Sequence, residues 1–153
     1  MARSEDVQSR LELLRSDLKG QAAKYLTLAR INYHFAYALM ILTLLFSVAA
    51  GIGGIFLPIS KEVVGGLALV PGVFALVANM LKPQGRANWH YRKHDELNEL
   101  LRRASFDLPA SPSASDVAKI ARAWSKVDKD MSLEWENKFS LDWSQFQNKG
   151  EPK

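Results

Sequence analysis

Two long uncharged runs constrain this chain more than any other feature of its sequence. No Asp, Glu, Lys or Arg occurs within residues 31–60 or within residues 63–81. The apolar segments inside these runs are Ala36–Leu57, of 22 residues, and Val63–Leu81, of 19 residues. As α-helices they would measure roughly 33 and 28 Å, close to the roughly 30 Å thickness of the hydrocarbon core of a bilayer. The two runs therefore predict two membrane-spanning helices.

The connector between the runs is short. Pro58–Glu62 can only reverse the chain, and inside lipid each segment must pair its backbone groups within itself. We therefore expect an all-α fold with a two-span transmembrane helical hairpin at residues 36–81. The alternative is a buried helical hairpin in a soluble bundle, but the remaining chain has too few apolar residues to cover it. A cleaved signal peptide fits poorly, because some thirty-five polar-rich residues precede the first run.

The basic residues predict the orientation of the hairpin. They flank its two outer ends, at Lys19, Lys24, Arg30, Lys82, Arg86, Arg92 and Lys93. The connector carries only Lys61, beside Glu62. By the positive-inside rule we expect a multi-pass protein of the inner (plasma) membrane with both termini in the cytoplasm. This placement also explains the net charge of +4 without nucleic acid as a partner.

The polar parts of the chain predict cytoplasmic helices before and after the hairpin. The expected segments are an amphipathic helix at 1–35, a helix at 82–108, a linker at 109–115, a helical segment at 116–146 and a disordered tail at 147–153. In the first of these, apolar residues recur at alternating steps of four and three, including Leu11, Leu18 and Tyr25. That stripe packs either on the C-terminal half of the same chain or in a coiled coil between subunits.

The C-terminal segment carries two further patterns. Ser113 and Asp116 have the spacing of a capping box, which predicts a helix from about Asp116 to Met131. After it, aromatic residues recur at helical spacing, at Trp135, Phe139, Trp143 and Phe146. Such a stripe favours a packing face on protein, and the alternative is insertion at the lipid headgroups.

Small and polar residues share one face of each predicted span. In the first span they are Thr43, Ser47, Gly51 and Gly54, and in the second they are Gly65, Ala68, Gly72, Ala75 and Asn79. Helices in lipid associate through small residues and polar contacts, so these are candidates for helix packing or for lining a pore. The two faces either mate within the hairpin or meet another subunit. Asn79 is the strongest functional candidate because its amide needs a partner or water, and Pro71 is expected to act as a hinge.

Residues at the ends of the spans suit a membrane interface. The candidates are Arg30, Tyr33, Lys82, Arg86 and Trp89. His90 and His94 are four residues apart, as helical metal ligands can be, but without a third ligand we expect an exposed polar face. His34 is interpreted as an ordinary interfacial histidine. No metal and no cofactor is expected.

The chain resembles the SLATT family, the two-transmembrane effector domains of bacterial nucleotide-second-messenger conflict systems. The resemblance covers roughly residues 10–105 and rests on a polar N-terminal helix, the tight hairpin and two juxtamembrane motifs. The motifs are Lys24-Tyr25…Ala29-Arg30-Ile31-Asn32-Tyr33 and Arg86-Ala87-Asn88-Trp89-His90-Tyr91-Arg92, the second leading into Leu97…Leu100-Leu101. It implies membrane disruption or pore formation in antiphage defence or cell suicide, triggered by a separate nucleotide-sensing partner protein.

Two functions follow from these observations. The first is a homo-oligomeric membrane effector that forms a pore, because two spans cannot enclose an aqueous path alone. The alternative is a non-conducting membrane adaptor whose cytoplasmic helices dock a soluble partner. An enzyme is not expected, since the chain has no Cys, no G-x-S-x-G motif and no phosphate-binding glycine loop.

Overall fold

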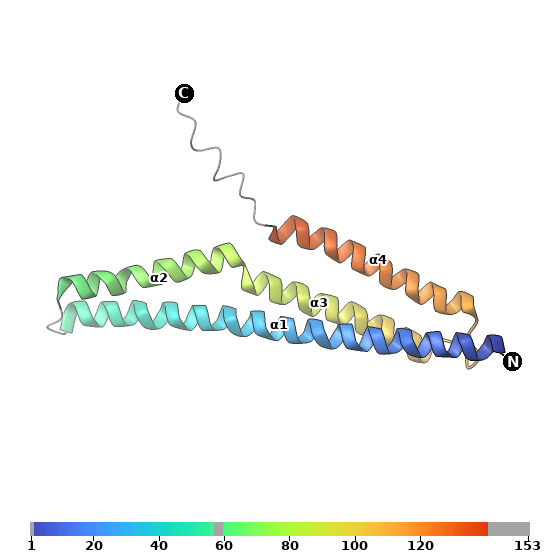
Figure 1. The fold of residues 1–153 in the computed structure, drawn as a ribbon. Coiled ribbons are helices and arrows are strands. Elements are labelled where there is room, and N and C mark those ends of the chain that lie inside the picture. Colours follow the sequence, from blue (N-terminus) through green and yellow to red (C-terminus); the bar gives the residue numbers. More distant parts are fainter. Residues whose placement is uncertain (1, 57–59, 141–153) are drawn as a thin grey trace, which may run out of the picture.

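The computed structural model describes residues 2–56 and 60–140 (Figure 1). Throughout these ranges the regular elements are helices and no strand occurs, so the predicted all-α class is confirmed. The elements are α1 (Ala2–Phe56), α2 (Lys61–Leu81), α3 (Pro83–Arg102), the π-helix η1 (Arg103–Asp107) and α4 (Ala114–Phe139). The predicted disordered tail, Trp143 and Phe146 lie outside the described residues.

Helices α2 and α3 pack along helix α1. Helix α1 has 55 residues, which corresponds to about 82 Å. Helix α2 runs back along its C-terminal part, and α3 continues along its N-terminal part (Figure 1). The predicted boundary at residue 35 therefore falls inside one continuous helix. Part of the predicted connector, residues 57–59, lies outside the described residues.

The chain changes direction between α2 and α3 at Lys82. This residue has φ 46° and ψ 48°, the left-handed conformation that commonly ends a helix. Its N–H donates to the Ala78 carbonyl at 3.0 Å, and Pro83 then occupies the first turn of α3. Proline suits that position because its missing N–H has no partner there in any helix. The helix therefore begins at Pro83, close to the start of the segment predicted at 82–108.

The first half of α1 packs with α3 and α4 around one apolar core. Its buried residues are Leu11, Leu18, Ala22, Leu97, Leu100, Ala104 and Ile120. The N-terminal stripe of α1 is thus covered by helices of its own chain, which answers the alternative left open above. We call this three-helix part the bundle.

A π-helical turn ends α3. In a π-helix the backbone hydrogen bonds run from i to i+5, so carbonyl groups leave the regular α-helical hydrogen-bond pattern. The guanidinium of Arg15, on α1, donates to the carbonyl oxygen of Ala104, with Nε at 3.0 Å. Residues 108–113 then lead without helix to α4, which turns back antiparallel to α3 (Figure 1).

The start of α4 has the predicted capping box. The Ser113 hydroxyl accepts from the Asp116 N–H at 3.3 Å, and the Asp116 carboxylate accepts from the Ser113 N–H at 3.2 Å. The helix continues to Phe139, beyond the predicted end near Met131. The sequence offers no Gly or Pro between these positions to stop it.

The second half of α1 and the whole of α2 leave many of their apolar side chains exposed. No residue of α2 is buried by the described chain, and Leu69 is 72% exposed. By length and composition, two helices of the described residues are capable of crossing a membrane.

Candidate functional site

The contact between α1 and α2 is made mostly by residues outside the small-residue set. On α1, Leu39 and Gly53 are buried, and the rings of Phe46 and Phe74 lie with centroids 5.8 Å apart. On α2 the partly buried positions include Val64, Leu67, Pro71, Phe74, Ala78 and Leu81. This helical series is the side of α2 that faces α1.

The predicted small residues of α2 lie one position further along the helix. Gly65, Ala68, Gly72, Ala75 and Asn79 are all exposed. A Cβ atom added to Gly65 or Gly72, or to Gly51 on α1, would meet no atom of a packing neighbour within 4 Å in the described chain. The alternative that the small residues mate within the hairpin is therefore wrong for these three glycines. Gly54 does pack, because its added Cβ would lie 3.4 Å from Val64 Cγ1.

The exposed small residues of both helices border one side of the helix pair. Ser47 of α1 and Ala75 of α2 line the same groove, which places the two sets next to each other. We call this surface the small-residue face; it consists of Ser47, Gly51, Gly54, Gly65, Ala68, Gly72, Ala75 and Asn79. Thr43 is half-buried at its edge.

The hydroxyl groups of this region are already satisfied within α1. Thr43 Oγ1 donates to the Leu39 carbonyl at 2.7 Å, and Ser47 Oγ donates to the Thr43 carbonyl at 2.8 Å. Such bonds to the preceding turn let a hydroxyl face an apolar surrounding. Asn79 differs, because its amide lies exposed on α2.

A groove of about 810 Å³ runs between α1 and α2 at the end nearest α3. Its walls include Leu39, Met40, Leu44 and Ala78. Tyr33, Tyr37, Lys82 and Gln84 also line it.

Pro71 lies inside continuous α2, and the chain changes direction at Lys82. The role of Pro71 as a hinge therefore stays a prediction.

The five residues assigned to a membrane interface are placed differently from one another. Arg30, Tyr33 and Lys82 are exposed and can contact water or lipid. The assignment is wrong for Trp89, which lies on α3, is buried against α1 and α4, and donates its indole N–H to the Met131 carbonyl at 3.2 Å. The Arg86 guanidinium lies over the Trp135 ring, 5.5 Å from its centroid, and so faces the bundle.

Trp89 belongs to an aromatic–basic cluster that sequence reasoning missed. Its members come from three helices and are Tyr25, Arg86, Trp89, His90, Lys93 and Trp135. The Trp89 and Trp135 ring centroids are 4.7 Å apart, and those of Trp135 and Phe139 are 4.8 Å apart. The C-terminal aromatic stripe thus packs on protein at Trp135 and Phe139, as expected.

Lys93 is the most deeply buried charged residue of this cluster. It is 4% exposed, and its Nζ lies 3.0 Å from Asp128 Oδ1 on α4. The same ammonium lies 4.6 Å from the centroid of the Tyr25 ring and 5.3 Å from that of Trp89. A buried ammonium needs such compensation, and here both a carboxylate and two aromatic faces provide it.

His90 and His94 do not form the exposed polar face that we expected. His90 is 7% exposed, and its ring stacks on Tyr25 with centroids 5.8 Å apart. Burial lowers the pKa of His90, and the charges of Arg86 and Lys93 lower it further. His94 Nδ1 lies 2.9 Å from the Ala22 carbonyl, and its Nε2 lies 2.8 Å from the Asn98 amide nitrogen. These partners indicate the tautomer with the proton on Nδ1.

A signal for this burial is present in the sequence. His90, Lys93, Leu97, Leu100 and Ala104 follow one another at steps of three and four, so the two polar residues continue the apolar stripe of α3. No group of three metal-ligating side chains occurs within residues 2–56 and 60–140.

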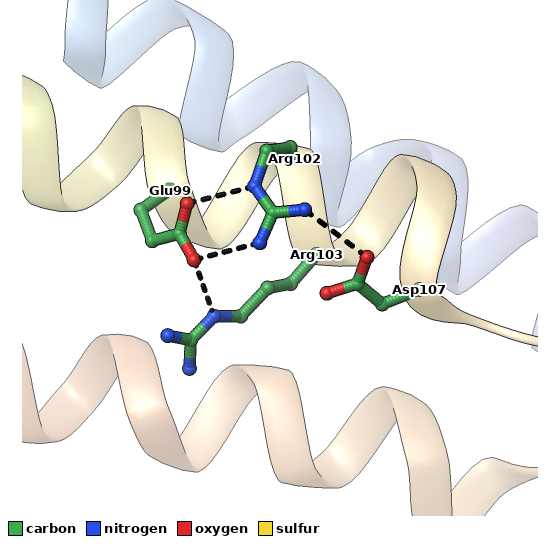
Figure 2. Close-up of polar contacts among 4 residues, drawn as sticks. All are labelled: Glu99, Arg102, Arg103 and Asp107. Atoms are coloured by element: carbon green, nitrogen blue, oxygen red, sulfur yellow. Dashed lines mark hydrogen bonds and ion pairs between the residues drawn. The ribbon is translucent and has the colours of Figure 1, made fainter.

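A second charged cluster lies where α3 passes into η1 (Figure 2). The Glu99 carboxylate accepts from Arg102 at 2.8 and 2.9 Å and from Arg103 Nε at 2.9 Å, and Arg102 also donates to Asp107 at 3.2 Å. Hydrogen bonds from the two arginines lower the pKa of Glu99 to about 2. All four side chains are at least partly open to solvent, so this cluster marks the surface of the bundle and does not form an enclosed site.

Comparisons of the chain with protein-family models, with curated proteins and with solved structures find no match.

Proposed function

We propose that this protein is a two-span membrane effector whose copies assemble into a pore or membrane-disrupting ring. The carrying observation is the exposure of α2. It is long and apolar enough to cross a membrane, yet none of its residues is buried by the described chain. A bilayer would cover the bulky side chains of such a helix without any penalty.

The small-residue face supports assembly into an oligomer. Gly51, Gly65 and Gly72 have open space beside them in the described chain, so the close approach that small residues permit is unused within one copy. Helices in lipid associate by that close approach, because lipid tails are as apolar as leucine. A second copy is therefore the partner that this face suits.

Asn79 supports a pore over a merely structural oligomer. Its exposed amide, on the small-residue face, would need water or a polar partner at membrane depth. In a ring of copies, several such amides would surround one axis. They could exchange hydrogen bonds with a permeating ion or its water shell.

The adaptor alternative has less support. Its docking platform would need free apolar surface on α3 and α4, but their stripes are occupied by α1 and by each other. Nothing in the proposed role requires catalysis. The trigger, in line with the family resemblance, would be a separate sensor protein that acts on the bundle.

Conductance across a planar bilayer tests this function. We expect the wild type to conduct, Asn79→Leu to conduct less because an apolar constriction favours dewetting, and Asn79→Asp to become more cation-selective. Thr27→Val, on the bundle half of α1, is the control and should conduct like the wild type. A wild type that inserts but stays silent at all protein densities would support the adaptor instead.

A further inference from the structure

The lining of the groove between α1 and α2 changes from apolar to polar along its length. From Ser47 to Tyr33 it follows α1 for about 21 Å, somewhat longer than half of the hydrocarbon core of a bilayer. Leu39, Met40, Leu44, Ala75 and Ala78 supply apolar walls. Because α2 runs antiparallel to α1, Lys82 and Gln84 lie toward the end that Tyr33 occupies.

The charge among the residues that line this groove has one sign. Lys82 lines it, with its Nζ donating to the Lys138 carbonyl at 3.4 Å, and no groove-lining residue of the described chain is acidic. Glu134 of α4, which lines a neighbouring pocket with Lys82, is paired with Arg92 and Lys138. In the sequence, no Asp or Glu occurs within residues 18–61 or within residues 63–94, which include both walls. The polar end of the groove therefore complements a negatively charged group.

We propose that this groove binds an anionic phospholipid, with an acyl chain along the apolar walls and the phosphate beside Lys82. The proposal rests on the membrane insertion proposed above. The order of the lining, apolar and then cationic, matches the order of a phospholipid from its chain to its headgroup. Tyr33 and Tyr37, 51% and 54% exposed, offer phenol groups at the headgroup level.

A helix of a second copy suits this end of the groove less well. It would cover Lys82 and Gln84, and taking a charged ammonium and an amide out of water costs free energy. A lipid headgroup leaves the ammonium of Lys82 hydrated and pairs it with a phosphate. Ser47 and Ala75 of the small-residue face also line the groove, whereas Gly51, Gly65 and Gly72 lie further along the helices, so a bound lipid would border the subunit contact at these glycines.

Native mass spectrometry of the full-length protein in detergent tests the proposal. Phosphatidylglycerol and phosphatidylcholine are added at equal concentration, and bound lipid is counted. We expect the wild type to prefer phosphatidylglycerol about fivefold, which is what one lysine contributes near an anionic lipid. Lys82→Gln should lose the preference and Lys82→Arg should keep it. Lys61→Gln, the same charge change at the other end of α2, should behave like the wild type.

A second pair of variants tests the groove itself. Ala78→Phe fills it and should reduce binding of both lipids, whereas Ala38→Phe adds the same ring at an exposed position of α1 outside the groove. Equal lipid preference in the Lys82→Gln and Lys61→Gln variants would overturn the proposal. Two further results would also overturn it. In the first, Ala78→Phe dissociates the oligomer but leaves lipid binding unchanged. In the second, inorganic phosphate alone displaces the lipid.

Alkaline extraction of membranes separates this failure from failure of the proposed function. A wild type that alkaline carbonate removes from membranes contradicts both proposals. A wild type that stays in the membrane and conducts, but shows no lipid preference, contradicts only the lipid site.

Discussion

The ammonium of Lys93 on α3 lies 3.0 Å from the carboxylate of Asp128 on α4. This pair joins the two helices inside the bundle, with Lys93 almost fully buried and the Asp128 side chain 47% exposed. Removal of the carboxylate would leave a buried charge with aromatic faces as its remaining compensation.

Asp128→Asn should therefore lower the free energy of unfolding by about 1–3 kcal/mol, the usual cost of an unsatisfied buried polar group. Chemical denaturation followed by tryptophan fluorescence measures it. Asp130→Asn, an exposed position on the same helix, is the control and should stay within about 0.5 kcal/mol of the wild type. If the Asp128 variant matched this control, Lys93 would not depend on the ion pair.

His90 should make the stability of the bundle depend on pH. Its folded pKa lies below the ordinary value of 6.5, so the unfolded chain binds more protons in that window. Stability is then complete above about pH 6.5 and falls as the pH drops below it. Thermal unfolding between pH 7.5 and pH 5 measures the slope. His90→Gln should reduce the slope, and His34→Gln, at an exposed position, should not. Equal slopes in all three proteins would contradict the role of His90.

Two glycines should respond differently to substitution by alanine. Gly20 lies in α1 with no packing neighbour within 4 Å in the described chain, so Gly20→Ala should stabilise by up to about 1 kcal/mol. At Gly85, an added Cβ would lie 3.1 Å from Phe139 Cε1, and the ring would have to move. Gly85→Ala should gain less or lose stability. Equal gains in denaturant titrations would show that Phe139 yields without cost.

The sequence predicted the helical class and the covered face of α1 because these depend on apolar periodicity. Leu11 and Leu18 lie in the core as their spacing requires. The capping box at Ser113 was also predictable, since it depends on two residues three positions apart. Periodicity did not identify what packs on the N-terminal stripe of α1. In the structure, α3 and α4 of the same chain cover it.

The aromatic–basic cluster could not be predicted in the same way. His90 and Lys93 are polar, and polarity favours exposure unless a partner compensates it. The compensation comes from Asp128 and Tyr25, which are distant in the sequence. The open space beside Gly72 could not be predicted either. A stripe of small residues on one helix does not show whether it faces the other helix of the hairpin or a helix of another molecule.

The orientation of the spans is a separate prediction. Basic residues at both outer flanks should hold the N- and C-termini in the cytoplasm. Fusions of a phosphatase and of a fluorescent protein at Lys153, and insertions of each at Ser60, measure the location of these sites. Phosphatase activity is expected only at Ser60. Activity of a phosphatase fused at the C-terminus would contradict the assignment.

Dye leakage from liposomes tests most directly whether copies permeabilise a bilayer through the small-residue face. Gly72→Leu and Gly66→Leu make the same change on α2, and both glycines have open space beside them in the described chain. Gly72 lies on the small-residue face, whereas Gly66 lies on the side shared with Leu69 and Val73. Overpacking at a helix contact costs about 1–3 kcal/mol.

We predict that the wild type and Gly66→Leu release the dye and crosslink as oligomers. Gly72→Leu should insert and keep its helix content but release the dye at a rate about tenfold lower, the equivalent of about 1.4 kcal/mol. Equal leakage from Gly72→Leu and Gly66→Leu would contradict assembly through this face, and no leakage from the inserted wild type would contradict the pore.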